Sequence, residues 1–399
     1  MKGYEKGRLP QVVFGSGTAA QVGTRLAACE LKKCLIVTGA CVSKHTVTKR
    51  AADSLTKAGI EWDVFTGVMP EPTDTLCLSL AKQIKEGGYD CVLAIGGGSP
   101  MDAAKAASLI AGIPEEIGDL HDYSRSGTKM RETWTRPCFL CAMPTTSGTG
   151  AEATGTGVLS SEAHHLKFSF GNRNTTADLA IIDPEFTLGM PAMPTAYGAV
   201  DALAHSTEMM IGLGSNEYTN AIVLNCIEKI WTWLPVALNE PQDLEAREQL
   251  SWAAHNALGN GGMANGHAVA HAIGAIYHLV HGHACMVTLP TLIRHHAQSA
   301  QESIAAIAGR IGVETTGEAE ADAGRVADAI LAFYKKLGMK PMRQAMEEKG
   351  FHDDLETFKA KVIPGTMDDF KSRLWMPPIH TGDYTEKVGK ICEMIYREE

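Results

Sequence analysis

Residues 91–105 read CVLAIGGGSPMDAAK, a short apolar run that leads through three glycines into an alanine-rich stretch. This order is typical of a buried strand that turns directly into a helix. Glycines let backbone N–H groups approach a diphosphate closely, and the helix N-terminus adds a partial positive charge. The stretch therefore predicts a phosphate-binding turn and a helix from about Met101, although an ordinary glycine-rich turn has the same pattern.

The rest of the first half repeats this alternation of strand and helix. Strands are expected over 34–38, 62–65, 91–95 and 138–143, and representative helices over 47–58 and 75–87. Each of these helices ends near a glycine that can cap it. The alternation predicts βαβ units and a parallel, doubly wound sheet.

The second half of the chain has a different pattern of apolar residues. Past Asp183-Pro184, apolar residues recur at helical spacing, which predicts helices over 197–210, 217–234, 244–258, 266–277 and 325–337. A chain of 399 residues exceeds the usual size of one hydrophobic core. We therefore expect two domains, an α/β dinucleotide-binding domain over 1–184 and an all-α metal-binding domain over 185–399.

Composition excludes several classes of partner. The formal charge of −10, from 36 basic and 46 acidic residues, disfavours binding to nucleic acid or to an anionic membrane. No apolar signal core opens the chain, and apolar runs such as 284–293 are too short to span a bilayer, so a cytoplasmic protein is expected. The ten cysteines lack a disulfide framework. The Cys138-x-x-Cys141 pair falls on an expected buried strand, where the two thiols face opposite sides.

A second loop accompanies the glycine turn. Residues 144–152, PTTSGTGAE, follow the expected strand over 138–143 and carry hydroxyls and glycines suited to ribose and phosphate. Two such loops at the carboxyl ends of parallel strands define one crevice. Clusters of Thr and Ser also form ordinary turns, so this loop alone is a weaker signal.

Histidines gather on otherwise apolar helices of the second half. Asp201 and His205 are spaced to share one helix face, as are His267 and His271, and His281 follows. One such histidine is usually a satisfied core residue. Several buried without partners would cost about 1–3 kcal/mol each, so a common metal is the better explanation. A donor set of histidine and aspartate, free of cysteine, suits iron(II) or zinc and leaves an open position for a substrate oxygen.

At these motifs the chain resembles the iron-containing (group III) alcohol dehydrogenases, a family with a dehydroquinate-synthase-like fold. The similarity runs from Val13 to about Pro290. It is carried by GGGSPMDAAK (96–105), PTTSGTGAE (144–152), IIDP (181–184), DALAH (201–205) with Glu208 beyond it, and GHAVAHAIGAIYHLVHG (266–282). The resemblance implies an NAD- or NADP-linked oxidoreductase that interconverts a small primary alcohol and its aldehyde, or a related hydroxy or oxo compound. It would act as a homodimer or higher homo-oligomer.

The resemblance also implies roles for single residues. The implied metal ligands are Asp201, His205, His267 and His281, and His271 faces the nicotinamide and the substrate. The cofactor contacts expected from the loops and from the resemblance are Gly39, Gly97, Gly98, Ser99, Asp102, Thr145, Thr146, Ser147, Thr149, Thr154, Val158 and Lys167. His278 and His283 match no ligand position and are expected to be structural or to support the ligands.

Three departures from the family pattern concern the substrate and the cofactor. Residues 375–380 replace a common Asn-Pro-Arg-like segment, and Glu71 stands where an asparagine often approaches the cofactor. Gly39 stands where NAD-preferring relatives commonly carry an aspartate that repels a 2′-phosphate. We therefore expect NADP(H) to be accepted and preferred over NAD(H). A glycine that merely turns the strand is the competing interpretation.

The expected chemistry is hydride transfer to C4 of the nicotinamide from an alcohol whose oxygen a metal polarises, with His271 relaying the proton. One alternative is a lyase resembling dehydroquinate synthase, which the DALAH and GHAVAH spacings disfavour. Another is a metal-free reductase of the maleylacetate type, disfavoured by the complete set of one aspartate and three histidines. A non-enzymatic binding protein is the third, and it would need neither the diphosphate loop nor the ligand cluster.

Overall fold

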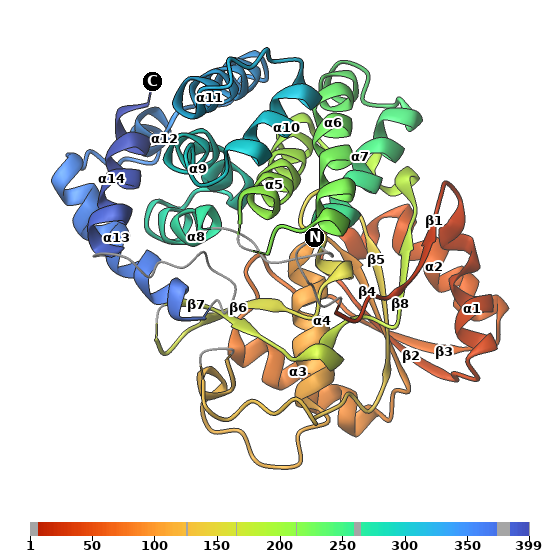
Figure 1. The fold of residues 1–399 in the computed structure, drawn as a ribbon. Helices are drawn as coiled ribbons and strands as arrows, with labels where there is room; N and C mark the ends of the chain where they lie inside the picture. Colours follow the sequence, from red (N-terminus) through yellow and green to blue (C-terminus); the bar gives the residue numbers. More distant parts are fainter. Residues whose placement is uncertain are drawn as a thin grey trace. The chain divides into compact units, whose positions relative to one another are not determined.

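The computed structural model describes residues 7–398 except 125–126, 165, 213, 259–264 and 373–383. The unusual segment at 375–380 therefore lies outside the described residues. The chain forms two compact units (Figure 1). One comprises Gly7–Met190 and Gln242–His255, and the other Pro191–Pro241 and the chain from Asn256 onward. The segment Gln242–His255, which the sequence analysis placed in the second domain, thus packs with the first unit.

A six-stranded parallel sheet forms the centre of the first unit, which confirms the expected fold class. Its strand order is β1 (Gln11–Phe14), β8 (Leu179–Ile182), β5 (Phe139–Pro144), β4 (Cys91–Gly96), β2 (Lys33–Val37) and β3 (Glu61–Phe65). The four expected strands are present with ends shifted by a residue. Strands β1 and β8, of four residues each, were not predicted.

Helices cover both faces of this sheet, and the side chains of β2 show how. Cys34 and Ile36 pack into the same core as α1 (Val22–Ala28) and α2 (Thr46–Lys57). Leu35 and Val37 pack into the core formed with α3 (Asp74–Gly87) and α4 (Gly98–Ile110). Successive residues of a strand point to opposite faces of the sheet. Because helices bury both faces, the strand needs an apolar residue at every position. The sheet is therefore doubly wound.

The same alternation separates the two cysteines of the C-x-x-C pair. Cys138 belongs to the core shared with α3 and α4, whereas Cys141 belongs to the core shared with α1 and α2. Both are free thiols. Burial raises the pKa of each, Cys141 well above its usual range. The expected burial of the two thiols on opposite faces of the strand is confirmed.

Smaller elements complete the first unit. An antiparallel hairpin of β6 (Gly157–Ser161) and β7 (Leu166–Phe170) packs on α3 and α4. Short 3₁₀ turns lie at η1 (Thr18–Gln21), η2 (Val42–Lys44), η3 (Leu120–Tyr123), η4 (Ala151–Ala153), η5 (Arg173–Thr175) and η6 (Pro184–Thr187). Helix α7 (Leu244–Leu258) joins the unit through hydrogen bonds between Ser251 and Ser147 and between His255 and Glu152.

The second unit is built from helices, as expected. They are α5 (Ala192–Ile211), α6 (Glu217–Asn239), α8 (Gly266–Tyr277), α9 (His281–His295), α10 (Gln301–Ile311), α11 (Ala319–Lys336), α12 (Met342–Glu348), α13 (Leu355–Ser372) and α14 (Tyr384–Arg397). Helix α5 packs on α6 and α9, and α8 packs on α9 and α13. Helix α5 begins at Ala192, earlier than the expected start at residue 197. Pro194 lies in the first turn of this helix, where a missing N–H costs nothing, so it does not prevent the earlier start.

Helix α6 is longer than the apolar runs from which the sequence predicted that no segment spans a bilayer. By length and composition alone, its 23 residues are long and apolar enough to cross a membrane. A helix that packs in a protein core passes the same test, and α6 packs against α5 and α10. Its spanning length is therefore weak support for a membrane location.

Candidate functional site

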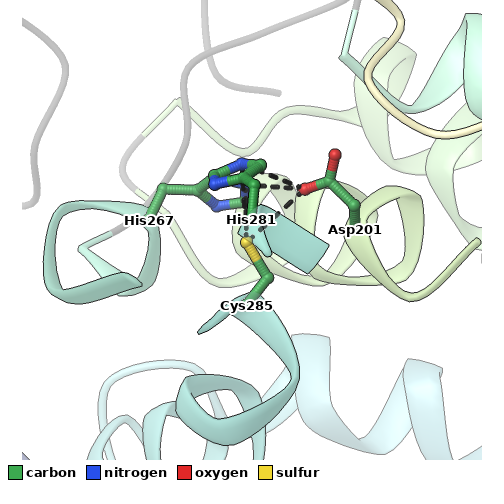
Figure 2. Close-up of side chains that lie close together, drawn as sticks. All are labelled: Asp201, His267, His281 and Cys285. Carbon is green, nitrogen blue, oxygen red and sulfur yellow. Dashed lines mark hydrogen bonds and ion pairs between the residues drawn. The ribbon is translucent and has the colours of Figure 1, made fainter. Parts of the chain in front are cut away.

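Three helices of the second unit bring donor atoms to one point. Oδ1 of Asp201, on α5, lies 3.3 Å from Nε2 of His267, on α8, and 3.4 Å from Nε2 of His281, on α9 (Figure 2). Asp201 and His267 are almost fully buried, whereas the His281 side chain is 35% exposed. Because both α5 and α8 pack against α9, residues distant in sequence converge here. The structure thus groups three of the four expected ligands.

The fourth expected ligand, His205, lies beside this group. It follows Asp201 by one helical turn, and its Nε2 is 3.7 Å from Asp201 Oδ1. Its ring stacks on that of His267 with a centroid separation of 4.3 Å. It is not a member of the four-residue set whose donor atoms all lie within 4.8 Å of one another.

That set instead includes a cysteine. Sγ of Cys285 lies 3.5 Å from both Asp201 Oδ1 and His267 Nε2, and 3.6 Å from His281 Nε2 (Figure 2). The sequence predicted donors from histidine and aspartate alone, and in the structure a thiol also lies among them. Cys285 follows His281 by one turn of α9, so it shares a helix face with that histidine. The same one-turn spacing that marked Asp201 and His205 was the signal that could have found it.

The cluster is arranged to hold a cation. Burial raises the pKa of Asp201, but His205, His281 and His267 outweigh burial and hold it well below its usual range. Burial lowers the pKa of His281, but Cys285 and Asp201 outweigh it and raise the pKa to about 10. The pKa of His267 is likewise raised well above its usual range despite burial. An ionised carboxylate among imidazoles that retain protons is a site where a metal ion replaces protons.

Two further carboxylates orient the histidines. Oε1 of Glu208 lies 2.5 Å from Nδ1 of His267. Oδ2 of Asp369, on α13, lies 3.1 Å from Nδ1 of His271. The ring of His271 is 5.1 Å from that of His281, so it borders the cluster. Sequence reasoning recorded Glu208 only as part of a motif and missed Asp369, because no local pattern links it to His271.

His278 and His283 lie outside the donor set. Nδ1 of His283 is 3.2 Å from the hydroxyl of Tyr197, and its Nε2 is 2.7 Å from the carbonyl oxygen of Lys340. His278 is exposed and ends α8 with a left-handed backbone, φ 54°. His283 therefore ties α9 to its neighbours, and His278 caps a helix.

In the first unit, the glycine turn and the Thr-Ser loop contact each other. Gly96 has φ +148°, which L side chains rarely adopt, and the next residue, Gly97, is the N-cap of α4. A Cβ on Gly98 would lie 3.1 Å from Cγ2 of Thr149. The N–H of Thr145 donates to the carbonyl of Gly96 at 2.8 Å. The carboxyl ends of β4 and β5 therefore present their backbone and hydroxyl groups at one place.

Thr146 and Ser147 occupy the middle of the second loop. A Cβ on Gly97 would lie 3.3 Å from Oγ1 of Thr146. The side chain of Thr146 therefore packs directly against the glycine turn. Ser147 is buried, and its hydroxyl is 2.9 Å from that of Ser251 on α7. Its hydroxyl therefore joins the loop to α7.

A buried lysine connects the turn to the following loop. Nζ of Lys105, on α4, donates to Oγ1 of Thr154 at 3.1 Å and to the carbonyl of Thr156 at 2.7 Å, and lies 3.5 Å from Asp102 Oδ1. Val158, another expected contact, lies on β6 next to this loop. Asp102 and Thr154 are thus fixed by one ammonium group.

Of the remaining expected contacts, Ser99 and Lys167 touch Glu71, whereas Gly39 lies after β2. The backbone N–H of Glu71 donates to Oγ of Ser99 at 3.2 Å, and its carboxylate lies 2.5 Å from Nζ of Lys167 on β7. Glu71 has a left-handed backbone, φ 59°. Gly39 follows β2 and pairs with Gly67, and a Cβ there would lie 3.0 Å from the carbonyl oxygen of Val68.

Comparison with known proteins shows which protein family this chain resembles. Residues 10–184 match the family model described as iron-containing alcohol dehydrogenase, and residues 195–366 match that of the C-terminal part of the same family. An NAD-dependent methanol dehydrogenase of Bacillus methanolicus is 32% identical over 330 residues, 82% of this chain and 85% of the relative. An NADPH-dependent butanol dehydrogenase of Clostridium saccharobutylicum is 30% identical over 335 residues, 83% of each.

A solved structure agrees with these matches. The crystal structure of a 1,3-propanediol oxidoreductase superposes with a TM-score of 0.88 at 28% identity, covering 99% of this chain and 100% of that one. The resemblance inferred from the motifs is confirmed, and with it the fold and the enzyme class, an oxidoreductase of alcohols and aldehydes.

Proposed function

Because the chain belongs to the family of iron-containing alcohol dehydrogenases, we propose that it transfers hydride between a nicotinamide dinucleotide and a small primary alcohol or aldehyde at a metal centre on α5, α8 and α9. A related hydroxy or oxo compound falls within the same chemistry. The observation that carries the proposal is the approach of His267 and His281 to one carboxylate oxygen of Asp201, at 3.3 and 3.4 Å.

The donor set fits iron(II) or zinc. Asp201, His267 and His281 offer one carboxylate oxygen and two imidazole nitrogens, which are common ligands of both ions. These residues would hold the metal, with His205 as the fourth ligand that the family pattern implies. When bound, such a metal supplies a Lewis acid for the alcohol or aldehyde oxygen.

His271 is the residue proposed to move the proton. Its Nδ1 lies 3.1 Å from Asp369, which orients the ring and stabilises its protonated form. It borders the metal cluster through His281. His271 can therefore exchange a proton between the reacting oxygen and solvent.

The first unit is proposed to bind the dinucleotide. The glycine turn offers backbone N–H groups at the N-terminus of α4, which suits a diphosphate. One relative is named as NAD-dependent and another as NADPH-dependent, so the family uses both cofactors. We propose that this chain accepts NADP(H) and prefers it to NAD(H), on the ground that Gly39 stands at the end of β2.

The test is turnover of NADPH and NADH with small aldehydes, before and after chelation and after reloading with Fe²⁺ or Zn²⁺. Replacing His267 or His281 with alanine should strip the metal and lower kcat/KM by at least about 10²-fold, as loss of a Lewis acid requires. His278→Asn is the matched control, because it changes a histidine outside the cluster and asparagine tolerates its left-handed backbone.

The outcomes separate the alternatives. Full activity in a metal-free preparation would contradict the proposal and favour a metal-free reductase. Chelator-sensitive turnover without net change in NADPH or NADH would favour a lyase that regenerates its cofactor. Absence of any turnover across aldehydes, alcohols and their acidic analogues would favour a binding protein.

We further propose that the protein is cytoplasmic and forms a homodimer or higher homo-oligomer. We also propose that the chain up to residue 184 binds the dinucleotide and that the chain after it binds the metal. The candidate ligands all follow that residue, and the two dinucleotide loops precede it. Strand β1 ends the described sheet with Val12 41% and Phe14 38% exposed, and such an edge can pair with a second copy. Sedimentation equilibrium tests the assembly: a monomer at micromolar concentration would contradict it.

A further inference from the structure

We propose that the carboxylate of Glu71 competes with the dinucleotide for the ammonium group of Lys167 and so lowers the affinity of the chain for its cofactor. The inference rests on the proposed function, since it assumes that a dinucleotide binds at the glycine turn before α4. It gives Glu71 a specific role, because this residue then sets how firmly the cofactor is held and how readily it leaves.

Glu71 contacts both the glycine turn and a cation beside it. Its backbone N–H donates to Oγ of Ser99, in the first turn of α4, at 3.2 Å. Its Oε1 lies 2.5 Å from Nζ of Lys167 on β7. The loop that carries Glu71 is held in place, because the N–H of Ser160 on β6 donates to the carbonyl of Pro72 at 3.0 Å. One residue thus connects the ammonium group of Lys167 to the turn that is proposed to bind the diphosphate.

The backbone at position 71 favours a different residue. Glu71 has φ 59°, in the left-handed region, where asparagine and aspartate are enriched among residues other than glycine. Glutamate has no such preference, so it is held there at a conformational cost. Strained residues of this kind cluster at ligand sites. What the glutamate adds is a carboxylate on a longer side chain, and that carboxylate is bound to Lys167.

The charges explain why this pair opposes cofactor binding. The side chain of Lys167 is 17% exposed and that of Glu71 is 57% exposed, so the lysine is largely covered while the glutamate faces solvent. An ammonium group attracts the phosphate oxygens of a dinucleotide, but Glu71 already balances its charge. A diphosphate must displace the carboxylate or lie beside it, and like charges repel. Removing the charge of Glu71 should therefore tighten dinucleotide binding about 3–30-fold at moderate salt.

The competition also affects how the cofactor leaves. A dehydrogenase exchanges its dinucleotide at every turnover, and in many enzymes the release of product limits kcat. As the dinucleotide leaves, the carboxylate of Glu71 can pair with Lys167 again. We therefore expect Glu71 to raise the dissociation rate of the dinucleotide more than it changes the association rate.

The experiment measures the dissociation constants of the full-length protein for NADPH and NADH from the fluorescence of the reduced nicotinamide. Glu71→Gln keeps the length of the side chain and removes only its charge, and Glu71→Asn also fits the left-handed backbone. We expect both variants to bind each cofactor at least about threefold more tightly and to release it more slowly in stopped flow. Glu162→Gln is the matched control, because Glu162 is an exposed carboxylate in the turn of the same hairpin and contacts Thr75 instead. Circular dichroism verifies that each variant is folded.

A second pair of variants tests whether the effect passes through Lys167. Lys167→Met removes the ammonium group, so in that background Glu71→Gln can relieve only the direct repulsion between the carboxylate and the phosphates. It should then tighten binding by a smaller factor than it does in the parent. An equal gain in both backgrounds would overturn the competition for Lys167.

The affinity of the parent separates this inference from the proposed function. If the parent binds NADPH or NADH and Glu71→Gln leaves the affinity unchanged, the role of Glu71 is contradicted and the proposed function stands. Weaker binding in Glu71→Gln would also contradict it, because the carboxylate would then orient Lys167 for the cofactor. A parent that binds neither NADPH nor NADH would overturn both proposals.

Discussion

Nδ1 of His267 lies 2.5 Å from Oε1 of Glu208, and Nε2 of the same ring lies 3.3 Å from Asp201. Both carboxylates project from α5, two helical turns apart. A carboxylate that accepts the proton of Nδ1 fixes the tautomer of the ring and leaves the lone pair of Nε2 for a metal. Glu208 is therefore a positioning residue for the metal centre, acting through His267.

The first prediction is that Glu208→Gln lowers metal affinity about 10–100-fold, the range typical when a partner of a metal-bound histidine is removed. The amide retains the shape of the side chain but is a weaker acceptor. Chelator competition measures the affinity. Glu228→Gln, which changes an exposed carboxylate on α6, should bind metal like the parent. Equal affinity in Glu208→Gln and Glu228→Gln would refute the positioning role.

The second prediction concerns the carboxylate at the centre of the cluster. Asp201→Asn removes the only carboxylate of the donor set at nearly constant volume, so metal retention should fall at least about tenfold. Elemental analysis after extensive dialysis measures the retained metal. Unchanged stoichiometry and affinity would show that Asp201 is not a ligand.

Local sequence patterns correctly predicted those helices and turns whose structure depends on their own residues. Helix α8 occupies the expected 266–277, and the turn after β4 forms where three successive glycines permit it. Cys285 follows His281 by one helical turn, but it was not predicted because a thiol inside the apolar run over 284–293 has the same pattern as a core residue. Periodicity records that a side chain is buried, and it contains no information on the atoms that meet it from other helices.

The sequence patterns also did not predict that α7 packs with the first unit or that Asp369 contacts His271, for the same reason. Helix α7 joins the first unit through Ser251 and His255, whose partners lie about 100 residues earlier in the chain. Asp369 meets His271 from a helix 98 residues later. Such pairings are tertiary, so single-sequence reasoning cannot find them without a known relative as a guide.

The third prediction tests the buried lysine beneath the dinucleotide loops. Lys105→Met leaves the carbonyl of Thr156 without its ammonium donor, which should cost about 1–3 kcal/mol of unfolding free energy and raise KM for the dinucleotide. Lys82→Met on α3 is the control, because that lysine is 74% exposed. Denaturant unfolding and cofactor titration give the two values. A Lys105→Met protein as stable as Lys82→Met would show that the contact contributes nothing.

The fourth prediction concerns acid stability. Burial, together with the positive charges of His295 and Lys387, lowers the pKa of His296 from 6.5 to about 4. The unfolded chain therefore binds a proton at His296 between about pH 6.5 and 4, while the folded chain does not. The stabilisation is complete above pH 6.5 and is lost as the pH falls towards 4, by up to about 3 kcal/mol.

His296→Gln should therefore flatten the decline in unfolding free energy across that range. Glutamine remains uncharged, and its amide can still donate to Asn265 as Nε2 of His296 does at 3.0 Å. His352→Gln, at an exposed histidine, is the control and should keep the slope of the parent. Identical slopes in all three proteins would rule out His296 as the source of acid sensitivity.

The last prediction is that Gly39 sets the cofactor preference. A carboxylate at the end of β2 would accept hydrogen bonds from the adenosine ribose and repel a 2′-phosphate, and Gly39 offers neither interaction. The parent should therefore have a higher kcat/KM with NADPH, and Gly39→Asp should shift the ratio towards NADH by at least about tenfold. Steady-state kinetics with both cofactors measures the ratio.

Gly39→Asn separates charge from packing in this experiment. Any side chain at position 39 places its Cβ 3.0 Å from the carbonyl oxygen of Val68, so both variants impose the same local adjustment. Only the aspartate adds a negative charge, so the asparagine variant should shift the ratio much less. If the parent already uses NADH tenfold better than NADPH, or if the two variants behave alike, then a group other than residue 39 distinguishes the cofactors.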